Sequence, residues 1–249
     1  MASQFEGKTV IVTGGNSGIG QATAVAFAAA GAKVIVTGRR KEAVDSTAKL
    51  HEGIVGVVAD VNSPDDARLV VEAAIKAGGG VDILVNNAGI AKFESLAELS
   101  ISNSREQFET NVIGLITISQ AALASLTERK GVIVNISSIV GSNPSAGGSV
   151  YSATKAAVNA LTRAWAKELA PIGVRVNAVA PGPINTPIFG KTGMTDEQIT
   201  GFKNNVTERV PLGRIGEPEE VAEWVLHVSS PSASWITGQI IGVDGGLAA

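Results

Sequence analysis

The stretch KTVIVTGGNSGIGQATAVAFAAAG, residues 8–31, decides how this 249-residue chain folds. Residues 8–13 are a β-branched apolar run of the kind that forms a buried strand. A glycine-rich turn at 13–20 follows at once, and the alanine-rich segment after it has the periodicity of a helix. A strand, a glycine-rich turn and a helix in direct succession predict a phosphate-binding site at the start of that helix.

Three glycines in this turn have separate physical tasks. Gly14 permits the tight reversal of the chain, Gly18 lets the backbone approach a pyrophosphate, and Gly20 lets the helix pack close to the sheet. The N-terminus of the helix then offers free N–H groups to the phosphate. We therefore predict cofactor contacts in this turn at Gly14, Asn16, Ser17, Gly18, Ile19 and Gly20. A Walker-type site is disfavoured because no Gly-Lys-Ser/Thr sequence follows.

Short Val- and Ile-rich runs alternate with longer helical segments along the chain. This alternation is typical of a doubly wound parallel sheet with helices on both faces. We predict a single-domain α/β Rossmann fold over residues 1–249, with seven parallel strands at 8–13, 33–37, 54–59, 81–85, 131–136, 174–179 and 239–243. Residues 181–212 are expected to be irregular, and their length favours a substrate lid at about 187–212.

The composition argues against several other classes of protein. A net charge of −3 with scattered charges gives no basic surface for nucleic acid. No apolar run approaches ~18 residues and no signal-like segment opens the chain, so we expect no membrane association and a cytoplasmic location. The chain has no cysteine, and His51 and His227 lack metal-ligand spacing, so no metal is expected.

The residues after the second strand distinguish NADP from NAD. NAD-binding folds carry an acid there that holds the ribose 2′-hydroxyl, whereas this chain has Gly38, Arg39 and Arg40. A guanidinium binds a 2′-phosphate through two charge-assisted hydrogen bonds. Two arginines at a helix start, where the dipole disfavours cations, also indicate an anion. The sequence therefore predicts NADP(H) as the cofactor.

The only tyrosine of the chain, Tyr151, lies four residues before Lys155 in the stretch YSATK. On a helix this spacing puts both side chains on one face, about 6 Å apart. An ammonium beside a phenol favours the phenolate, so we expect Lys155 to lower the pKa of Tyr151 from ~10. Such a phenol can serve as the acid in ketone reduction or the base in alcohol oxidation. The other interpretation of an isolated pair is a Tyr and a Lys on the surface of an amphipathic helix.

Five motifs occur in order: TGGNSGIG at 13–20, NNAG at 86–89, NISS at 135–138, YSATK at 151–155 and PGPINT at 181–186. With these and the terminal GVDGG, the chain resembles the short-chain dehydrogenase/reductase family over essentially its whole length. The resemblance implies a catalytic tetrad of Asn111, Ser138, Tyr151 and Lys155. In that tetrad Ser138 polarises the substrate carbonyl, and Asn111 holds a water that links Lys155 to solvent. Ser137, by the alternation of a strand, should point away.

The same resemblance implies cofactor contacts outside the glycine-rich turn. Asp60 and Val61 would lie beside the adenine, and Asn87, Ala88 and Gly89 along the adenosine ribose and pyrophosphate. The full predicted set here is Arg39, Arg40, Asp60, Val61, Asn87, Ala88, Gly89, Tyr151, Lys155, Pro181, Gly182, Ile184 and Thr186. Asn86 is assigned to fold stability, and Asp60 could equally cap the following helix.

These observations predict an NADPH-dependent oxidoreductase that reduces a ketone to a secondary alcohol, reversibly. Few charges lie near the expected site, which favours a moderately apolar ketone. The segment RVPLGRIGEPEEVA, residues 209–222, is similar to 3-oxoacyl-carrier-protein reductases, which gives the alternative substrate. A non-catalytic NADP-binding sensor is less favoured because the tetrad is intact. The apolar candidates for the pocket wall are Val140, Ile188, Phe189, Met194 and Phe202.

The assembly is predicted from the family resemblance and from two long apolar-rich helices at 104–128 and 150–169. Each must bury more than one stripe if it packs on the sheet and also on a neighbouring subunit. We therefore expect a homotetramer with two-fold symmetry.

Overall fold

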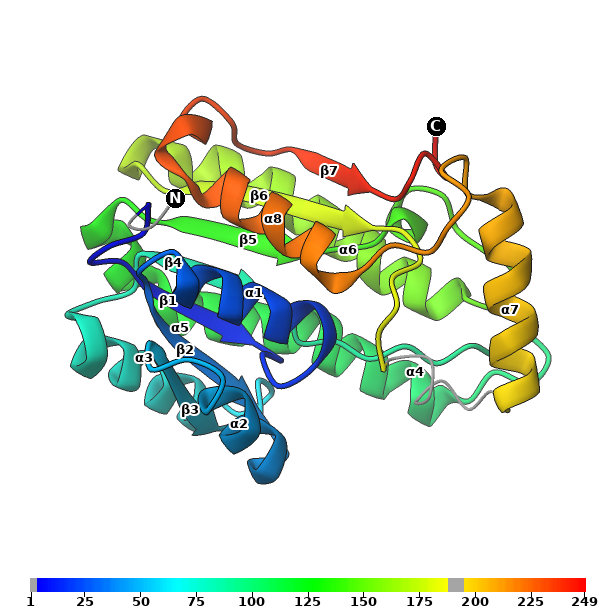
Figure 1. The fold of residues 1–249 in the computed structure, drawn as a ribbon, viewed down its shortest axis with the longest axis horizontal. Helices are drawn as coiled ribbons and strands as arrows, with labels where there is room; N and C mark the ends of the chain where they lie inside the picture. Colours follow the sequence, from blue (N-terminus) through cyan, green and yellow to red (C-terminus); the bar gives the residue numbers. More distant parts are fainter. Residues whose placement is uncertain (1–3, 188–194) are drawn as a thin grey trace.

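The computed structural model describes residues 4–187 and 195–249. Its strands form one seven-stranded sheet in the order β3-β2-β1-β4-β5-β6-β7, with all neighbours parallel (Figure 1). The strands are β1 (Thr9–Thr13), β2 (Lys33–Gly38), β3 (Ile54–Val58), β4 (Ile83–Asn86), β5 (Val132–Ile136), β6 (Arg175–Pro181) and β7 (Ile240–Val243). The predicted α/β fold is confirmed, and each predicted strand is present with ends shifted by two residues or fewer.

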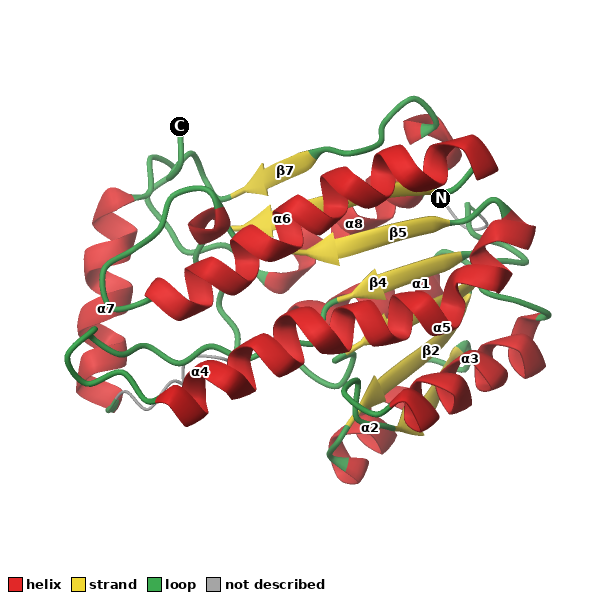
Figure 2. Cartoon of the chain, turned by 180° about the vertical axis from the view of Figure 1, so that it is seen from behind, coloured by secondary structure: helices red, strands yellow, loops and turns green. Residues whose placement is uncertain are grey.

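Helices cover both faces of the sheet because the strand side chains alternate between them. Val10 and Val12 point to the face covered by α1 (Gly18–Ala29), α2 (Lys41–Ala48) and α8 (Pro218–Ser229) (Figure 1). Ile11 points to the opposite face, which is covered by α3 (Pro64–Gly78), α5 (Gly114–Arg129) and α6 (Ser149–Leu169) (Figure 2). Two apolar cores result, one on each side of the sheet.

Two further helices lie beyond the carboxyl ends of the strands: α4 (Ile101–Phe108) and α7 (Asp196–Arg209) (Figure 1). The expectation that residues 181–212 are irregular throughout was therefore wrong. Helix α7 is mostly polar and contains Gly201, so its sequence lacks the clear apolar periodicity that marks the other helices. The strand order reverses between β1 and β4, and ligands bind at such switch points in doubly wound sheets.

The long helix predicted from residue 104 is a composite. After α4, a π-helical turn at Glu109–Ile113 leads into α5, and Asn111 lies within that turn. The run Ile101–Arg129 is long and apolar enough to cross a membrane by length and composition alone. However, Ile118, Ala122 and Leu126 are buried in the core against the sheet, so we interpret it as a core helix.

Candidate active site

Three of the predicted catalytic side chains meet beyond the carboxyl end of β5. Ser138 lies two residues after the end of that strand, and Tyr151 and Lys155 lie on the first two turns of α6. Lys155 is 5% exposed; its Nζ donates a 2.8 Å hydrogen bond to the carbonyl of Ile136 and lies 5.8 Å from the centre of the Tyr151 ring. Ser137 points away, since its hydroxyl donates to Asn159 Oδ1 at 2.6 Å in the interior.

The pKa of Tyr151 differs from the expectation. Burial raises it to about 12, and a hydrogen bond with the Ser138 side chain lowers it only partly. Lys155 does not lower it, because its ammonium is turned toward the Ile136 carbonyl and is itself destabilised by burial, which lowers the lysine pKa to about 8. At neutral pH Tyr151 is therefore protonated, which a proton donor requires, although the raised pKa makes it a weaker acid than a free tyrosine.

Two hydrogen bonds hold the hydroxyl of Ser138 in place beyond the carboxyl end of β5. It caps the short 3-10 turn at Ile139–Gly141, where its Oγ accepts a 3.4 Å hydrogen bond from the N–H of Val140. The same hydroxyl donates a 3.4 Å hydrogen bond to the carbonyl of Pro181 at the end of β6. Both hydrogen bonds are long and therefore weak, so a substrate carbonyl can compete for the hydroxyl.

The side chain of Asn111 is 1% exposed and fully engaged as a donor. Its Nδ2 donates to the carbonyl of Ile90 at 2.9 Å and to Thr154 Oγ1 at 3.0 Å, and its Oδ1 accepts from the N–H of Ile90 at 2.8 Å. The side chain therefore fastens the loop after β4 to α6. A water linked to Lys155 would need a group of Asn111 other than its amide N–H groups.

The glycine-rich turn lies at the β1/β4 switch point and is closely packed. Gly14 and Gly18 have φ of +61° and +52°, which L side chains rarely adopt. A Cβ on Gly14 would lie 2.9 Å from Ala88 Cα, and one on Gly20 would lie 2.3 Å from Asn87 Nδ2. Helix α1 begins at this turn with no side-chain cap on its first N–H groups. The turn thus leaves backbone donors free for a phosphate.

The two asparagines of NNAG have different tasks. Asn86 is 3% exposed and donates to Asn135 Oδ1 and Ser119 Oγ, both at 2.9 Å, as its assignment to fold stability predicts. Asn87 Nδ2 donates to the carbonyls of Thr13 and Gly14 at 2.9 and 3.1 Å, so this amide shapes the glycine-rich turn.

Thr13 is a contributor that the sequence analysis missed. Its Oγ1 accepts from the N–H groups of Asn87 and Ala88, each at 3.0 Å. These bonds fix the NNAG segment beside the glycine-rich turn. The signal available in the sequence was a hydroxyl residue at the last position of β1.

Arg39 and Arg40 lie just after the carboxyl end of β2. Both are exposed, and Arg40 is the N-cap of α2. The ion pairs found in residues 4–187 and 195–249 include neither arginine. Gly38 faces the glycine-rich turn, where a Cβ would lie 2.8 Å from Asn16 Cγ. The glycine-rich turn and the two arginines therefore border one space.

Asp60 does not cap α3. Ser63 is the N-cap, with its Oγ accepting from Asp66 N at 3.2 Å, while Asp60 Oδ1 accepts from Asn62 N at 3.0 Å. Asp60 thus forms the turn that follows β3, with Val61 beside it. Val61 packs against α5, where a Cβ on Gly114 would lie 2.7 Å from its Cγ2.

The segment Pro181–Thr186 connects β6 with the predicted lid. Thr186 lies over the glycine-rich turn, since a Cβ on Gly18 would come within 3.2 Å of its side chain. Ile184 is 6% exposed and forms a parallel bridge with Gly216. Gly182 faces the C-terminal segment, where a Cβ would lie 2.7 Å from Asp244 Cα, so packing explains this glycine. The expected pocket residues Ile188, Phe189 and Met194 lie outside the described residues, as does the side chain of Phe202.

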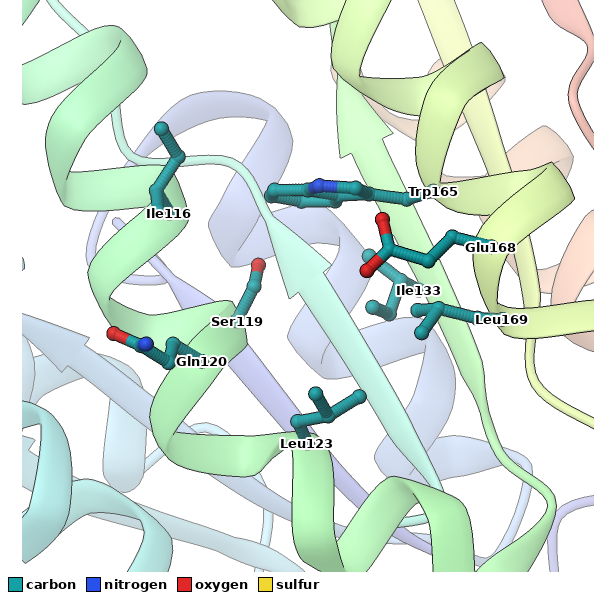
Figure 3. A pocket seen from close by; sticks show the side chains of 8 residues that line it. All are labelled: Ile116, Ser119, Gln120, Leu123, Ile133, Trp165, Glu168 and Leu169. Atoms are coloured by element: carbon teal, nitrogen blue, oxygen red, sulfur yellow. The ribbon is translucent and has the colours of Figure 1, made fainter. Parts of the chain in front are cut away.

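One cavity of the described chain lies away from this site. It has a volume of about 210 Å³ and opens between α5 and α6, where Trp165 extends from α6 toward α5 (Figure 3). Trp165 is fourteen residues after Tyr151, which corresponds to about 20 Å along a helix. This cavity therefore belongs to the outer face of the helix pair and not to the chemistry.

A doubly wound sheet with a glycine-rich turn at its switch point and a Ser, Tyr and Lys cluster beside it defines a dinucleotide-binding α/β protein. The family model described as enoyl-(acyl carrier protein) reductase matches residues 14–248. The 3-oxoacyl-[acyl-carrier-protein] reductase of Thermotoga maritima is 41% identical over 249 residues, covering 98% of this chain and 99% of that one. The chain belongs to the short-chain dehydrogenase/reductase family of oxidoreductases.

Two further relatives are informative. Carbonyl reductase family member 4 of Danio rerio is 38% identical over 243 residues, covering 96% of this chain and 98% of that protein. The crystal structure of a 3-ketoacyl-(acyl-carrier-protein) reductase from Brucella melitensis complexed with NADH superposes with a TM-score of 0.91. It is 33% identical and covers 98% of this chain, with 100% of that chain covered.

Proposed function

We propose that this protein reduces a ketone to a secondary alcohol with NADPH, and that Tyr151 donates the proton. The observation that carries the proposal is the convergence of Ser138, Tyr151 and Lys155 at the carboxyl edge of the sheet. A buried phenol that keeps its proton, a hydroxyl in weak hydrogen bonds and a buried ammonium are the groups that carbonyl reduction needs.

The described residues fit a nicotinamide dinucleotide. The glycine-rich turn and the uncapped start of α1 would hold the pyrophosphate, and Lys155 would hold the nicotinamide ribose. Arg39 and Arg40, which lack an ion-pair partner in the described chain, would bind the 2′-phosphate that distinguishes NADP from NAD. When bound, the cofactor supplies the hydride to the carbonyl carbon.

The residues of this chain would then manage the oxygen of the substrate. Ser138 would give up its 3.4 Å hydrogen bond to Pro181 and donate to the carbonyl oxygen, which polarises the C=O bond. Tyr151 would transfer its phenolic proton to the same oxygen as the alkoxide forms. Lys155 would stabilise the resulting phenolate once its ammonium turns from the Ile136 carbonyl toward the Tyr151 ring, whose centre is 5.8 Å away. Asn111 would support this step by fixing the loop after β4.

The relatives favour one class of ketone over others. The Thermotoga maritima and Brucella melitensis relatives are named as reductases of 3-oxoacyl groups on a carrier protein, and the Danio rerio relative is named as a carbonyl reductase. We propose a 3-oxoacyl thioester as the first substrate class to test, with free ketones as the second. Both place a ketone carbon next to apolar chain, which suits the sparse charge near the site.

NADPH consumption with a 3-oxoacyl thioester and a panel of free ketones tests the proposal. The Tyr151→Phe variant keeps the ring but removes the proton, so turnover should fall by ~10²-fold or more while NADPH still binds. Ser138→Ala should lower turnover with little effect on NADPH affinity, and Lys155→Met should weaken both. Near wild-type turnover in Tyr151→Phe, with normal NADPH binding, would show that another group donates the proton.

We also propose that residues 187–212 act as a lid over the substrate. The base of the lid is supported by the Ile184–Gly216 bridge and by the bidentate pair of Arg214 with Glu220, at 2.6 and 2.7 Å. Arg214 lowers the pKa of Glu220 to about 2.

We propose further that the protein works as a homotetramer. The apolar groove between α5 and α6 is the surface that a second copy of the chain would cover.

A further inference from the structure

The ring of Phe93 stands beside Tyr151, although no motif of the chain includes it. The two ring centres are 5.9 Å apart, with the planes at 67° to each other in an edge-to-face arrangement. Phe93 is half-buried and belongs to neither of the two apolar cores. A large apolar side chain that contacts Tyr151 and lies outside both apolar cores is therefore available to contact a substrate.

The loop that carries Phe93 is held at several points. The N–H of Lys92 donates to Oε1 of the buried Gln107 at 3.0 Å, and the N–H of Glu94 donates to the carbonyl of Gly147 at 2.7 Å. The Glu94 carboxylate accepts from Asn103 Nδ2 at 2.7 Å, at the start of α4. Both neighbours of Phe93 are therefore fixed, one to the helix side and one to the loop before α6.

The Phe93 ring also has a neighbour at the start of α6. A Cβ on Gly148 would lie 3.3 Å from ring carbons of Phe93, so the ring already lies against the start of α6. The hydrogen bonds of Lys92 N and Glu94 N and the contact with Gly148 together hold the Phe93 segment beside Tyr151. Its position is thus set by the fold before any substrate binds.

We propose that Phe93 determines which substituent the substrate can carry beside its carbonyl, by forming the pocket wall next to Tyr151. This inference rests on the proposed ketone reduction. A carbonyl oxygen that takes the phenolic proton must lie within hydrogen-bond reach of Tyr151, which brings one neighbouring substituent against Phe93. The wall admits a methyl or a slender chain on that side and disfavours a ring.

The test compares two 3-oxo esters that differ only in this substituent: ethyl acetoacetate, with a methyl group, and ethyl benzoylacetate, with a phenyl group. Phe93→Ala should raise the ratio of kcat/KM for the phenyl over the methyl ester by about tenfold or more, since pocket contacts discriminate on this scale. Gly148→Ala should push the ring forward and lower the same ratio. Leu96→Ala, in the same loop but 87% exposed, should leave the ratio within about twofold.

NADPH affinity and the thermal midpoint are measured for each variant. If Phe93→Ala folds poorly, Phe93→Leu keeps an apolar side chain and should still raise the ratio severalfold. An unchanged ratio in a Phe93 variant that binds NADPH normally would overturn the inference, while ketone reduction by the wild type would stand. If the wild-type protein reduces no ketone in the panel, the proposed function fails, and the inference fails with it.

Discussion

At the residue scale, one helix turn of α6 separates two groups with opposite pKa shifts. Burial raises the pKa of Tyr151 to about 12 and lowers that of Lys155 to about 8. In both cases burial disfavours the charged form, and their proximity does not reverse it because the ammonium is directed at the Ile136 carbonyl. The neutral phenol and the cationic ammonium therefore coexist at neutral pH.

We predict that the reductase activity falls as the pH rises through about 8. Lys155 is charged below its folded pKa of about 8 and loses its charge above it, whereas Tyr151 keeps its proton until about 12. The measurement is kcat/KM for NADPH between pH 6 and 10, beside the tyrosinate absorbance of the cofactor-free protein, which reports only Tyr151 because the chain has one tyrosine. If the absorbance titrated near pH 8, Tyr151 and not Lys155 would be the group that limits activity.

At the element scale, the turn after β1 and the end of β2 act as one unit. Gly38 is tightly covered by Asn16, so a side chain at position 38 needs Asn16 to move. This contact joins the glycine-rich turn to the end of β2. It therefore affects any substitution at position 38 that is meant to change the cofactor from NADPH to NADH. An acid at position 38 alone would meet Asn16 before it met a ribose.

We predict that Arg39→Leu lowers kcat/KM for NADPH by about tenfold or more and leaves that for NADH nearly unchanged, because a charge-assisted contact with the 2′-phosphate is lost. Gly38→Asp with Arg39→Leu should raise kcat/KM for NADH, and adding Asn16→Ala, which removes the side chain that meets position 38, should raise it further. Steady-state rates with both cofactors check this. Lys49→Leu, at the exposed C-terminal end of α2, removes an equal charge and should change neither. A wild-type protein that used NADH as well as NADPH would contradict the assignment.

At the scale of the whole molecule, the cluster of Ser138, Tyr151 and Lys155 lies beyond the carboxyl ends of the strands. The apolar groove lies on the outer face of α5 and α6. The groove is lined by apolar groups such as Ile116, Leu123 and Trp165, with Glu168 at its side (Figure 3). A second subunit that covered it would bury the apolar area that the monomer leaves open.

We predict a tetramer whose mass falls when a charge is placed in this groove. Trp165→Glu should shift the assembly to smaller species, because an unpaired carboxylate would be buried in the interface. Light scattering at micromolar protein measures the mass, and Lys49→Glu on α2 serves as the control for added negative charge. A monomeric wild type would contradict the proposed assembly, and an unchanged tetramer in Trp165→Glu would place the interface elsewhere.

The sequence by itself determined the sheet, its strands and the positions of the site residues, because each depends on local patterns. Short Val- and Ile-rich runs, a glycine-rich turn after the first strand and the Tyr151–Lys155 spacing are all local features of the sequence. Helix α7 was not predicted, because its polar sequence carries little periodicity.

Only the tertiary structure decided how groups far apart in the chain act on one another. It turned Lys155 toward Ile136, used the amide of Asn111 to hold the loop after β4, set Asn16 over Gly38 and brought Phe93 against Tyr151. Burial and direction of approach arise when the loops after different strands converge at one edge, and no local pattern encodes them. The convergence of Ser138, Tyr151 and Lys155 was therefore predictable, whereas the pKa shifts of Tyr151 and Lys155 and the approach of Phe93 to Tyr151 were not.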